Sequence, residues 1–362
     1  MTTLILENGY NDLVRSRIPL GEYFKSKGLE VHYACPQPQR DTVYEVPMSR
    51  SSLSLIKLIK GFVRLIQIEK KLSIDTILSF RFIPNVLNYL ASFTNKEVKR
   101  VVVITGLGYA FIPTNRTLSS RIQRYLITLF YRIASRRIQI VAQNPDDLID
   151  LGVENGKVIL GSGVDTAVSA NDSIIPTSSI KLLYVGRLLK SKGINTAIDV
   201  YEQLKIKSPN ASLTIAGTID SQNPDSISEE EVTLLKNIKG INYLGFVADM
   251  NEVYANNNVL LFPSDYREGI PRVIIEALKY GLTIITKEMP GCKETVRNNG
   301  FLMTDFYEIE DVLDYLLKLN SSSLLVNKNA SIELFRKTFS SDVIFPMYLT
   351  MLKQALVSKY KV

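Results

Sequence analysis

Short apolar runs rich in β-branched residues alternate along the chain with segments of helical periodicity. This alternation is typical of parallel sheets that are covered by helices. In the first half it predicts strands at Thr3–Leu6, Leu29–Ala34, Thr76–Ser79, Arg100–Ile104, Ile138–Val141 and Lys157–Leu160. Helical segments lie between these runs, so the first half is predicted to form one doubly wound domain.

The pattern is interrupted and then restarts. Between Asp165 and Ser179, small and polar residues with proline replace the periodic apolar positions, which is the composition of a linker. Beyond it the alternation predicts strands at Lys181–Val185, Ser212–Ala216, Asn242–Leu244, Val259–Phe262 and Thr283–Ile285. We therefore expect an α/β protein of two Rossmann-like doubly wound domains facing a cleft, with ligands bound outside the carboxyl ends of the strands.

Length and cysteine content agree with this organisation. A chain of 362 residues is long for one core and sufficient for two domains. The two cysteines, Cys35 and Cys292, lie far apart and predict neither a zinc site nor a disulfide, which fits a reducing cytoplasm. We expect neither a secretory leader nor a membrane-spanning helix, because the sequence has no suitably long apolar run.

The net charge of +7 is unevenly distributed. Residues 1–144 contain 21 Lys and Arg against 9 Asp and Glu, whereas the remainder contains 22 against 27. A basic front half predicts an anionic partner there, either nucleic acid or an anionic membrane surface.

The segment from Glu268 to Glu276 is the most informative one for chemistry. Glu268 follows a predicted buried strand, and Glu276 lies in a helix that Pro271 is suited to start, because a first turn does not need its missing N–H. The N–H groups of a helix start suit a phosphate, and carboxylates accept hydrogen bonds from sugar hydroxyls, so the pair predicts a sugar-nucleotide site. The alternative is that Glu276 is a solvated partner of Arg272 and Glu268 an ordinary acid near a helix start.

The loop after the first strand of the second half is basic. It runs from Gly186 to Gly193 and contains Arg187 and Lys192, which are able to reach the strand end and neutralise a diphosphate. The alternative is that both side chains are simply solvated.

The loops that end the following strands are small. Gly217 ends one, and Gly245–Val247 ends the next, where a close backbone and an apolar side chain suit a flat base. Ordinary turn chemistry is the alternative for each. Pro290–Glu294 ends another strand and is expected to shape the sugar side.

Together these segments resemble the retaining glycosyltransferases of family 4, which have the two-domain GT-B fold. Two glutamates separated by seven residues are the signature of that family. The resemblance is carried by Gly186-Arg187, Lys192-Gly193, Gly245-Phe246, Ser264–Ala277 and Pro290–Val296. In the first half, Arg17–Gly28 and Thr105–Tyr109 are similar to bacterial enzymes that lengthen a polyprenyl-diphosphate-linked glycan.

The resemblance implies a role for each matched residue. Arg187 and Lys192 would hold the donor diphosphate and balance the charge on the leaving nucleotide. Glu276 would bind the ribose, and Glu268 would bind the transferred sugar and take part in catalysis. The other residues expected at the donor are Gly186, Gly217, Gly245, Phe246, Val247, Gly269, Ile270 and Pro271.

The resemblance also implies a function and a domain plan. The donor would be a UDP-sugar carrying an N-acetylhexosamine or a hexose, and the acceptor a polyprenyl-diphosphate-linked glycan for O-antigen or capsule. Residues 1–165 would form the acceptor and membrane-facing domain, and residues 166–344 the donor domain. Residues 345–362 would form a helix that crosses back to the first domain. The residues expected to pack that helix are Phe345, Met347, Tyr348 and Leu352.

The chain departs from the family at several positions. Many relatives have histidine after the strand Thr76–Ser79, where this chain has Phe80, Arg81 and Phe82, and the first loop, Glu7–Asp12, lacks a glycine pair. The single histidine, His32, is expected to be structural.

We expect no metal, because the sequence has no Asp-x-Asp triplet. Retention without an evident protein nucleophile favours front-face attack, in which the acceptor hydroxyl gives its proton to the departing phosphate.

Two segments of the front half predict basic amphipathic helices. In Ser51–Lys71 the basic residues are Lys57, Lys60, Arg64 and Lys71, opposite Leu55, Ile59, Phe62 and Ile66. In Leu118–Arg137 they are Arg121, Arg124, Arg132 and Arg136, beside Ile122, Leu126, Leu129, Phe130 and Ile133. We expect the apolar faces to pack on the first sheet and the charges to attach the protein to the inner face of the cytoplasmic membrane.

Two other functions stay open. A non-transferring UDP-sugar 2-epimerase shares the fold, although the glutamate pair with Arg187 and Lys192 favours transfer. A basic nucleic-acid-binding protein is the remote alternative, and the chain lacks a recognition motif for it.

Overall fold

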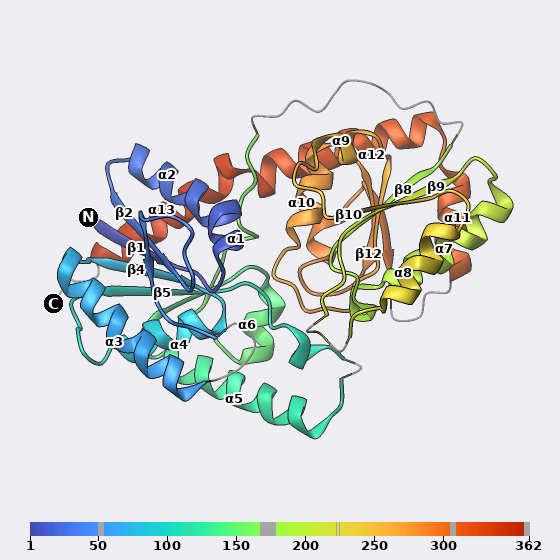
Figure 1. Ribbon diagram of the computed structural model, residues 1–362. Helices are drawn as coiled ribbons and strands as arrows, with labels where there is room; N and C mark the ends of the chain where they lie inside the picture. The colour runs from blue at the N-terminus through green and yellow to red at the C-terminus, as the bar shows by residue number, and fades with distance from the viewer. Residues whose placement is uncertain are drawn as a thin grey trace. The chain divides into compact units, whose positions relative to one another are not determined.

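The computed structural model describes residues 1–49, 54–113, 115–166, 179–221, 223, 225–304 and 309–357. The chain divides into two compact units (Figure 1). Met1–Ala110 and Arg116–Gly163 belong to the first unit together with the C-terminal segment from Ser341, and Val164–Ser340 forms most of the second. The first unit therefore gives way to the second at Gly163, and most of the expected linker Asp165–Ser179 lies outside the described residues.

The first unit is built on a parallel sheet with the strand order β3-β2-β1-β4-β5-β6-β7. β1 at the centre pairs with β2 on one side and β4 on the other, with Leu4 opposite both His32 and Ile77. The strand order reverses between β1 and β4. The strands are β1 (Thr2–Leu6), β2 (Glu30–Cys35), β3 (Val43–Glu45), β4 (Thr76–Phe80), β5 (Lys99–Ile104), β6 (Gln139–Ala142) and β7 (Lys157–Val158).

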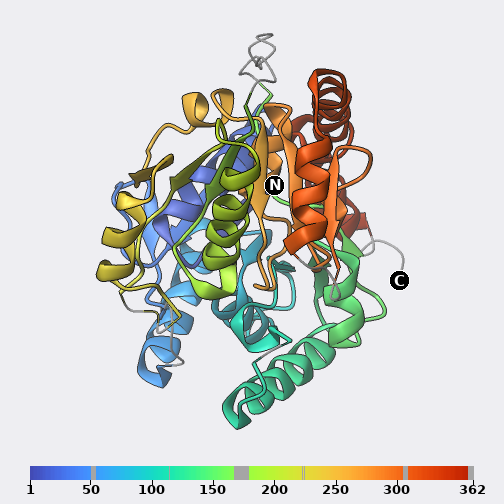
Figure 2. The same cartoon turned by 90° about the vertical axis from the view of Figure 1, so that its right-hand side faces the viewer.

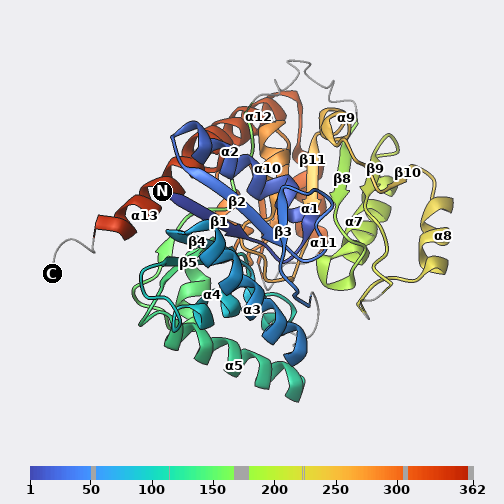
Figure 3. The same ribbon diagram turned by 60° about the vertical axis from the view of Figure 1, so that its left-hand side comes forward.

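Helices cover both faces of this sheet (Figure 3). Leu4 and Leu6 point into a core with α3 and α4, whereas Ile5 between them points into a second core with α2 and α13. This alternation follows from the period of two along a strand. The helices are α1 (Tyr10–Asp12), α2 (Ile18–Ser26), α3 (Leu55–Leu72), α4 (Phe82–Ala91), α5 (Leu118–Ala134), α6 (Pro145–Leu151) and α13 (Ser341–Val357).

The terminal helix α13 packs against the sheet of the first unit. The Tyr348 ring lies 6.1 Å from the Phe80 ring, and the Phe345 ring lies 5.7 Å from that of Tyr23. Leu352 is also buried, but the packing role expected for Met347 is wrong, because its side chain is 42 % exposed. Met347 lies on the face of the helix that points away from the sheet.

The prediction that the apolar faces of both basic helices pack on the first sheet is wrong for much of each helix. In α5, Ser120, Tyr131 and Ala134 are buried, whereas Ile122, Leu126, Leu129 and Ile133 are exposed. In α3, Leu55 and Ile59 are exposed, although Phe62 and Ile66 pack against the core. The inner face of α5 is instead fixed by aromatic and polar contacts, in which Phe130 packs on Phe82 and the Tyr131 hydroxyl accepts from Asn85.

The second unit contains a six-stranded parallel sheet with the order β10-β9-β8-β11-β12-β13, which reverses between β8 and β11. Its strands are β8 (Lys181–Val185), β9 (Ser212–Ala216), β10 (Ile241–Gly245), β11 (Val259–Phe262), β12 (Thr283–Lys287) and β13 (Gly300–Met303). Every predicted strand is present, with ends within two residues of those expected. The short edge strands β3 and β13 were not predicted, because neither has a long apolar run.

Helices also cover both faces of the second sheet. In Figure 2 the yellow-green α7 and the orange-red α11 lie side by side on one face, and they share a core with β8 and β9. α10 and α12 pack on β12 from the other face. The helices are α7 (Ile194–Lys207), α8 (Glu229–Asn237), α9 (Asn251–Ala255), α10 (Arg272–Lys279), α11 (Ile309–Lys318) and α12 (Ser321–Leu334). Among the described residues, no helix has the length and apolar character needed to span a bilayer.

A buried ion pair joins α3 to β5 in the first unit. Arg100 donates through both terminal nitrogens to Glu69, over 3.0 and 2.9 Å, and both side chains are almost wholly buried. Asn88 of α4 accepts a further hydrogen bond from Arg100 over 3.2 Å. The pair therefore joins three elements within the unit.

Replacing Arg100 by methionine should lower the free energy of unfolding by roughly 3–5 kcal/mol, because it leaves Glu69 as a buried charge without its cation. The measurement is urea unfolding followed by circular dichroism. The double change Arg100→Met with Glu69→Leu is the control and should recover most of the loss, since no isolated charge remains. A loss below about 1 kcal/mol in the single variant would contradict this role.

Candidate functional site

The residues singled out by sequence meet at one edge of the second sheet. Because its strands are all parallel, the loops that follow them emerge at the same side. The loop after β8 contains Gly186, Arg187 and Lys192, and the loop after β9 begins at Gly217. β10 ends at Gly245 and is followed by Phe246 and Val247. The loop after β11 contains Glu268, Gly269, Ile270 and Pro271 and leads into the helix that carries Glu276. Spatial proximity at this edge is a consequence of the topology.

Backbones at the ends of three strands are in direct contact. The Gly217 N–H donates to the Gly245 carbonyl over 2.8 Å, and the Gly186 N–H donates to the Ala216 carbonyl over 3.0 Å. A Cβ on Gly217 would lie 1.8 Å from the Gly186 oxygen, a separation that no side chain tolerates. On the β10 side, this edge of the sheet is therefore lined by glycine backbone without side chains, and a flat ligand is able to approach it closely.

The buried Tyr184 supports the backbone of the basic loop Gly186–Gly193. Its hydroxyl lies within hydrogen-bonding distance of the Arg187 carbonyl, at 3.3 Å, and of the Lys192 carbonyl, at 3.4 Å. The residue is fully buried, and burial raises its pKa far above the usual range, so the hydroxyl keeps its proton as a donor. Asp225 fixes the same loop from another side by accepting from the Ser191 N–H over 3.0 Å.

Lys192 and Glu268 form an ion pair across the point where the strand order reverses. Their Nζ and Oε1 atoms are 2.8 Å apart, with 14 % and 22 % of the side chains exposed. Lys192 comes from the loop after β8 and Glu268 from the loop after β11, and ligands of open α/β sheets bind between two such strands. A cation and a carboxylate are therefore both presented, half-buried, at the expected binding point.

Arg187 stands next to this pair and is more exposed. Its guanidinium lies 2.6 Å from a carboxylate oxygen of Asp220, with 46 % and 30 % of the side chains exposed. Asp220 follows β9, so this pair also joins two neighbouring loops at the edge. A diphosphate that reaches Arg187 has to compete with that carboxylate.

Arg272 and Tyr254 both donate hydrogen bonds to the Glu276 carboxylate. One oxygen accepts from Arg272 Nε over 2.8 Å and the other from the Tyr254 hydroxyl over 3.0 Å. The helix salt bridge considered from the sequence therefore exists. These contacts hold the Glu276 carboxylate in one orientation.

The start of α10 differs slightly from the prediction. The helix begins at Arg272, and Pro271 is its N-cap rather than its first residue, with an extended ψ of 120°. Pro271 still supplies no N–H that would need a partner. The preceding Gly269 is covered by the loop Pro290–Glu294, where a Cβ on Gly291 would lie 1.8 Å from the Gly269 oxygen. Gly291 also has a φ of +88°, which favours glycine.

Phe246 is presented at the end of β10. Its side chain is 80 % exposed, which is unusual for a ring of this size. An exposed aromatic side chain beside bare backbone provides a surface for a planar ring.

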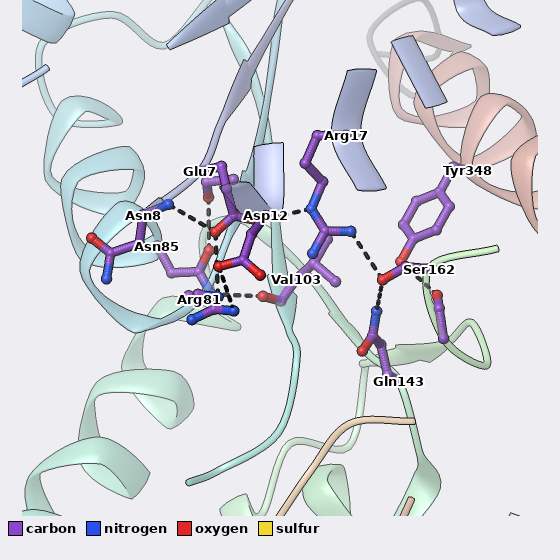
Figure 4. Close-up of polar contacts among 12 residues, drawn as sticks. Glu7, Asn8, Asp12, Arg17, Arg81, Asn85, Val103, Gln143, Ser162 and Tyr348 are labelled. Atoms are coloured by element: carbon purple, nitrogen blue, oxygen red, sulfur yellow. Dashed lines mark hydrogen bonds and ion pairs between the residues drawn. The ribbon is translucent and has the colours of Figure 1, made fainter. Parts of the chain in front are cut away.

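A second polar cluster lies at the carboxyl ends of β1 and β4 in the first unit (Figure 4). Glu7 is fully buried and accepts from Arg17 over 2.8 Å, while Arg81 lies 3.4 Å from Glu7 and 2.9 Å from Asp12. Arg81 has a φ of +72°, a strained conformation for a residue with a Cβ. Two guanidiniums and two carboxylates balance their charges here.

Arg17 connects this cluster to the segment that ends at Gly163. It donates to Ser162 over 3.0 Å, and Gln143 donates to the same hydroxyl over 3.0 Å. The Tyr348 hydroxyl of α13 donates to the Gly161 carbonyl over 3.4 Å. The network therefore helps to hold α13 in the first unit.

The sequence did not point to several residues of these sites. Asp220 and Asp225 follow β9 and could have been found by asking which acids follow predicted strands. Tyr184 reads as an ordinary buried strand residue, so no sequence signal marks it. His32 lies on β2, as expected, with its ring 3.0 Å from Glu30. In the part of the chain described here, no three His, Cys, Asp or Glu side chains gather as a metal site would require.

Two family models match this chain. The model of the glycosyl transferases group 1 matches residues 166–332, and the glycosyl transferase 4-like model matches residues 6–144. The capsular polysaccharide biosynthesis glycosyltransferase CapM of Staphylococcus aureus is 25 % identical over 376 residues, covering 95 % of each chain. The UDP-Gal:alpha-D-GlcNAc-diphosphoundecaprenol alpha-1,3-galactosyltransferase of Escherichia coli is 24 % identical over 298 residues, covering 77 % of this chain and 75 % of that protein.

Solved structures share the fold. The sucrose-phosphate synthase of Thermosynechococcus elongatus aligns with a TM-score of 0.82 at 15 % identity, over 99 % of this chain and 100 % of that one. HepE of Anabaena, in complex with UDP and glucose, aligns with a TM-score of 0.77 at 18 % identity, over 98 % and 100 %. The expected GT-B fold of two Rossmann-like α/β domains is confirmed.

Replacing Tyr184 by phenylalanine should loosen the basic loop while leaving the core filled. Loss of its hydroxyl removes a donor to two loop carbonyls, and about 1 kcal/mol is typical for such a bond, so amide hydrogen exchange at Lys190–Gly193 should accelerate about fivefold. Tyr201→Phe is the matched control, since that hydroxyl donates to the Lys239 carbonyl elsewhere in the unit. Unchanged exchange in the Tyr184 variant would show that the loop does not depend on it.

Proposed function

This chain belongs to the group 1 glycosyltransferases with a glycosyl transferase 4-like N-terminal part, and we propose that it transfers a hexose or N-acetylhexosamine from a UDP-sugar to a polyprenyl-diphosphate-linked glycan. It is a glycosyltransferase of bacterial polysaccharide synthesis. The observation that carries the proposal is the Lys192–Glu268 pair at the strand-order reversal of the second sheet.

The donor diphosphate binds between the loops after β8 and β11. Lys192 and Arg187 supply two cations there, and Arg187 exchanges Asp220 for phosphate oxygens when the donor arrives. Fixed cations stabilise a departing nucleoside diphosphate more strongly than mobile water does, because their orientation is settled before the reaction. Supporting this, both side chains are already held at the sheet edge by neighbouring acids.

The two glutamates bind different parts of the donor. Glu268, next to Lys192, accepts hydrogen bonds from hydroxyls of the transferred sugar, with help from the backbone over Gly269, Ile270 and Pro271. Glu276, oriented by Arg272 and Tyr254, accepts from the ribose. The base lies toward β10, beside Phe246 and Val247 and over the bare backbone of Gly186, Gly217 and Gly245.

The reaction retains the anomeric configuration. The acceptor hydroxyl attacks the anomeric carbon from the face that the diphosphate leaves, its proton passes to the departing phosphate oxygen, and the bond from the anomeric carbon to that oxygen breaks. Arg187 and Lys192 balance the negative charge that develops on the leaving group. Two fixed cations at this position make a metal ion unnecessary.

Relatives support the donor and acceptor classes. The Escherichia coli relative is named for UDP-Gal and a diphosphoundecaprenol-linked acceptor, and the Anabaena structure contains UDP and glucose. Assembly of O-antigen or capsule on a lipid carrier places the acceptor in a bilayer, so an enzyme that acts on it works at the inner face of the cytoplasmic membrane.

Basic residues of the first unit are suited to that location. Lys57, Lys60, Arg121 and Arg136 are all exposed. Two arginines of α5 are engaged within the unit instead: Arg124 bonds to the Ala110 carbonyl and Arg132 to the Leu151 carbonyl. Each exposed cation near an anionic bilayer contributes about 1 kcal/mol of attraction.

Separate substitutions should distinguish the two glutamates. Glu276→Ala should raise the KM for the nucleotide sugar about 10- to 100-fold with a smaller change in kcat, because a charged hydrogen-bond acceptor for the ribose is lost. Glu268→Ala should lower kcat about 100-fold. Steady-state kinetics with radiolabelled UDP-sugars provide the measurement.

Two controls accompany these variants. Arg272→Ala breaks the helix salt bridge but keeps the Glu276 carboxylate, so a comparable rise in KM there would reassign the Glu276 effect to helix structure. Asp265→Asn alters the nearby pair with Lys287, whose atoms are 2.7 Å apart, and should leave kcat within about threefold. Wild-type kinetics in both glutamate variants would refute the proposed site.

Transfer should persist in EDTA. We expect a rate within about twofold of that with added Mg²⁺, because protein cations neutralise the diphosphate, and NMR of the product should show the anomeric configuration of the donor. Loss of activity in EDTA with recovery on adding a divalent ion would refute metal independence. An inverted product would refute front-face attack.

A further inference from the structure

Helix α5 of the first unit carries a continuous apolar stripe on its solvent side. Its members recur three or four residues apart, which places them on one helical face. They are Leu118 (74 % exposed), Ile122 (51 %), Tyr125 (67 %), Leu126 (53 %), Leu129 (40 %) and Ile133 (45 %). A contiguous apolar surface of this kind marks an interaction site, whereas single exposed apolar residues do not.

The contacts of α5 hold this stripe outward. Arg132 donates to the Leu151 carbonyl over 3.0 Å, and Arg124 donates to the Ala110 carbonyl. On the inner side, the Phe130 ring lies 5.4 Å from Phe82 and 5.5 Å from Tyr89. Because polar and aromatic contacts already fix the inner side, rotating the helix to bury its stripe would break them.

Helix α3 of the same unit repeats this arrangement. Leu55, Ile56, Ile59 and Val63 are 68 %, 67 %, 56 % and 48 % exposed, whereas Gly61, Leu65 and Ile68 on the opposite face are buried. α3 and α5 flank α4 in one layer on the same side of the sheet (Figure 3). Each of the two outer helices of this layer therefore presents apolar residues to solvent.

The charges around the stripe indicate its partner. α5 contains no Asp or Glu, the exposed Arg121 borders its apolar face, and the exposed Arg136 follows the end of the helix. Lys57 and Lys60 border the stripe of α3. Two copies of this chain joined through α5 would bring like charges together, whereas an anionic bilayer offers phosphates to the arginines and acyl chains to the stripe.

We propose that α5 is an interfacial helix that lies in the plane of an anionic bilayer, with its stripe inserted below the headgroups and α3 beside it. Tyr125 suits the boundary, since its ring is apolar and its hydroxyl polar. The reason for such an attachment rests on the proposed function, because a lipid-linked acceptor lies in a membrane. The attachment itself is assigned mainly to burial of the apolar stripe and only secondarily to charge attraction. Apolar burial is not screened by salt, so attachment persists when electrostatic attraction is weakened.

The test uses the full chain and vesicles of phosphatidylethanolamine with a minor fraction of phosphatidylglycerol, in low and in high salt. The triple variant Ile122→Ser, Leu126→Ser, Leu129→Ser should bind at least about tenfold more weakly than the wild type in high salt. A matched control carries Ile206→Ser, Leu234→Ser and Val326→Ser, at positions 82 %, 66 % and 58 % exposed in the second unit. The control should bind like the wild type.

Several results would overturn the proposal. Wild-type chain that leaves the vesicles in high salt would mean that charge alone attaches it, and a triple variant that binds like the wild type would mean that the stripe is not inserted. Sedimentation that shows a wild-type dimer, dissociated by the triple variant, would assign the stripe to a second copy. Circular dichroism of each variant verifies folding.

Vesicle binding needs neither donor nor acceptor. Failure of the proposed sugar transfer would therefore leave the binding result intact, and normal transfer to a detergent-dissolved acceptor with no vesicle binding would refute the interfacial helix alone.

Discussion

The parallel pairing of every strand is the constraint on which both sites depend. A parallel sheet requires each chain segment to return through a helix, so all loops that follow strands emerge at one edge. Where the strand order reverses, at β1 and β4 in one unit and at β8 and β11 in the other, adjacent loops diverge. An ion pair joins the two loops at each reversal, Glu7 with Arg81 and Lys192 with Glu268. Oppositely charged side chains thus meet where the fold leaves room for a ligand.

The cations of the candidate donor site are each paired with a protein carboxylate. Arg187 pairs with Asp220, Lys192 with Glu268, and Arg272 with Glu276. Such pairs keep the long side chains oriented. They change the free energy of unfolding little, because partly exposed ion pairs contribute little stability. Under the proposed function, a donor diphosphate would compete with these carboxylates for cations that are already oriented. Such binding would be weaker than at unpaired cations, but it would also cost less ordering entropy.

Amphipathic helices in this chain show why a pattern does not decide which face is buried. Hydrophobic periodicity predicted α5 correctly as a helix and wrongly as one that packs with its apolar face inward. Periodicity reports that one face is apolar, and the neighbour that this face meets is settled by packing. In α5, Ser120, Tyr131 and Ala134 are buried against the unit, whereas Ile122, Leu126, Leu129 and Ile133 remain exposed.

The sequence by itself determined the strands, the two-part organisation and the segment with Glu268 and Glu276, because apolar periodicity, turn residues and family motifs are local properties. It missed the edge strands β3 and β13, which have only three and four residues. Tertiary structure alone decided that Tyr184 supports the basic loop, that Asp220 holds Arg187, and that α5 turns its stripe to solvent. The first two features join residues that are distant in the chain, and the third depends on which surface of the helix a neighbour covers. A local sequence pattern predicts neither kind of feature.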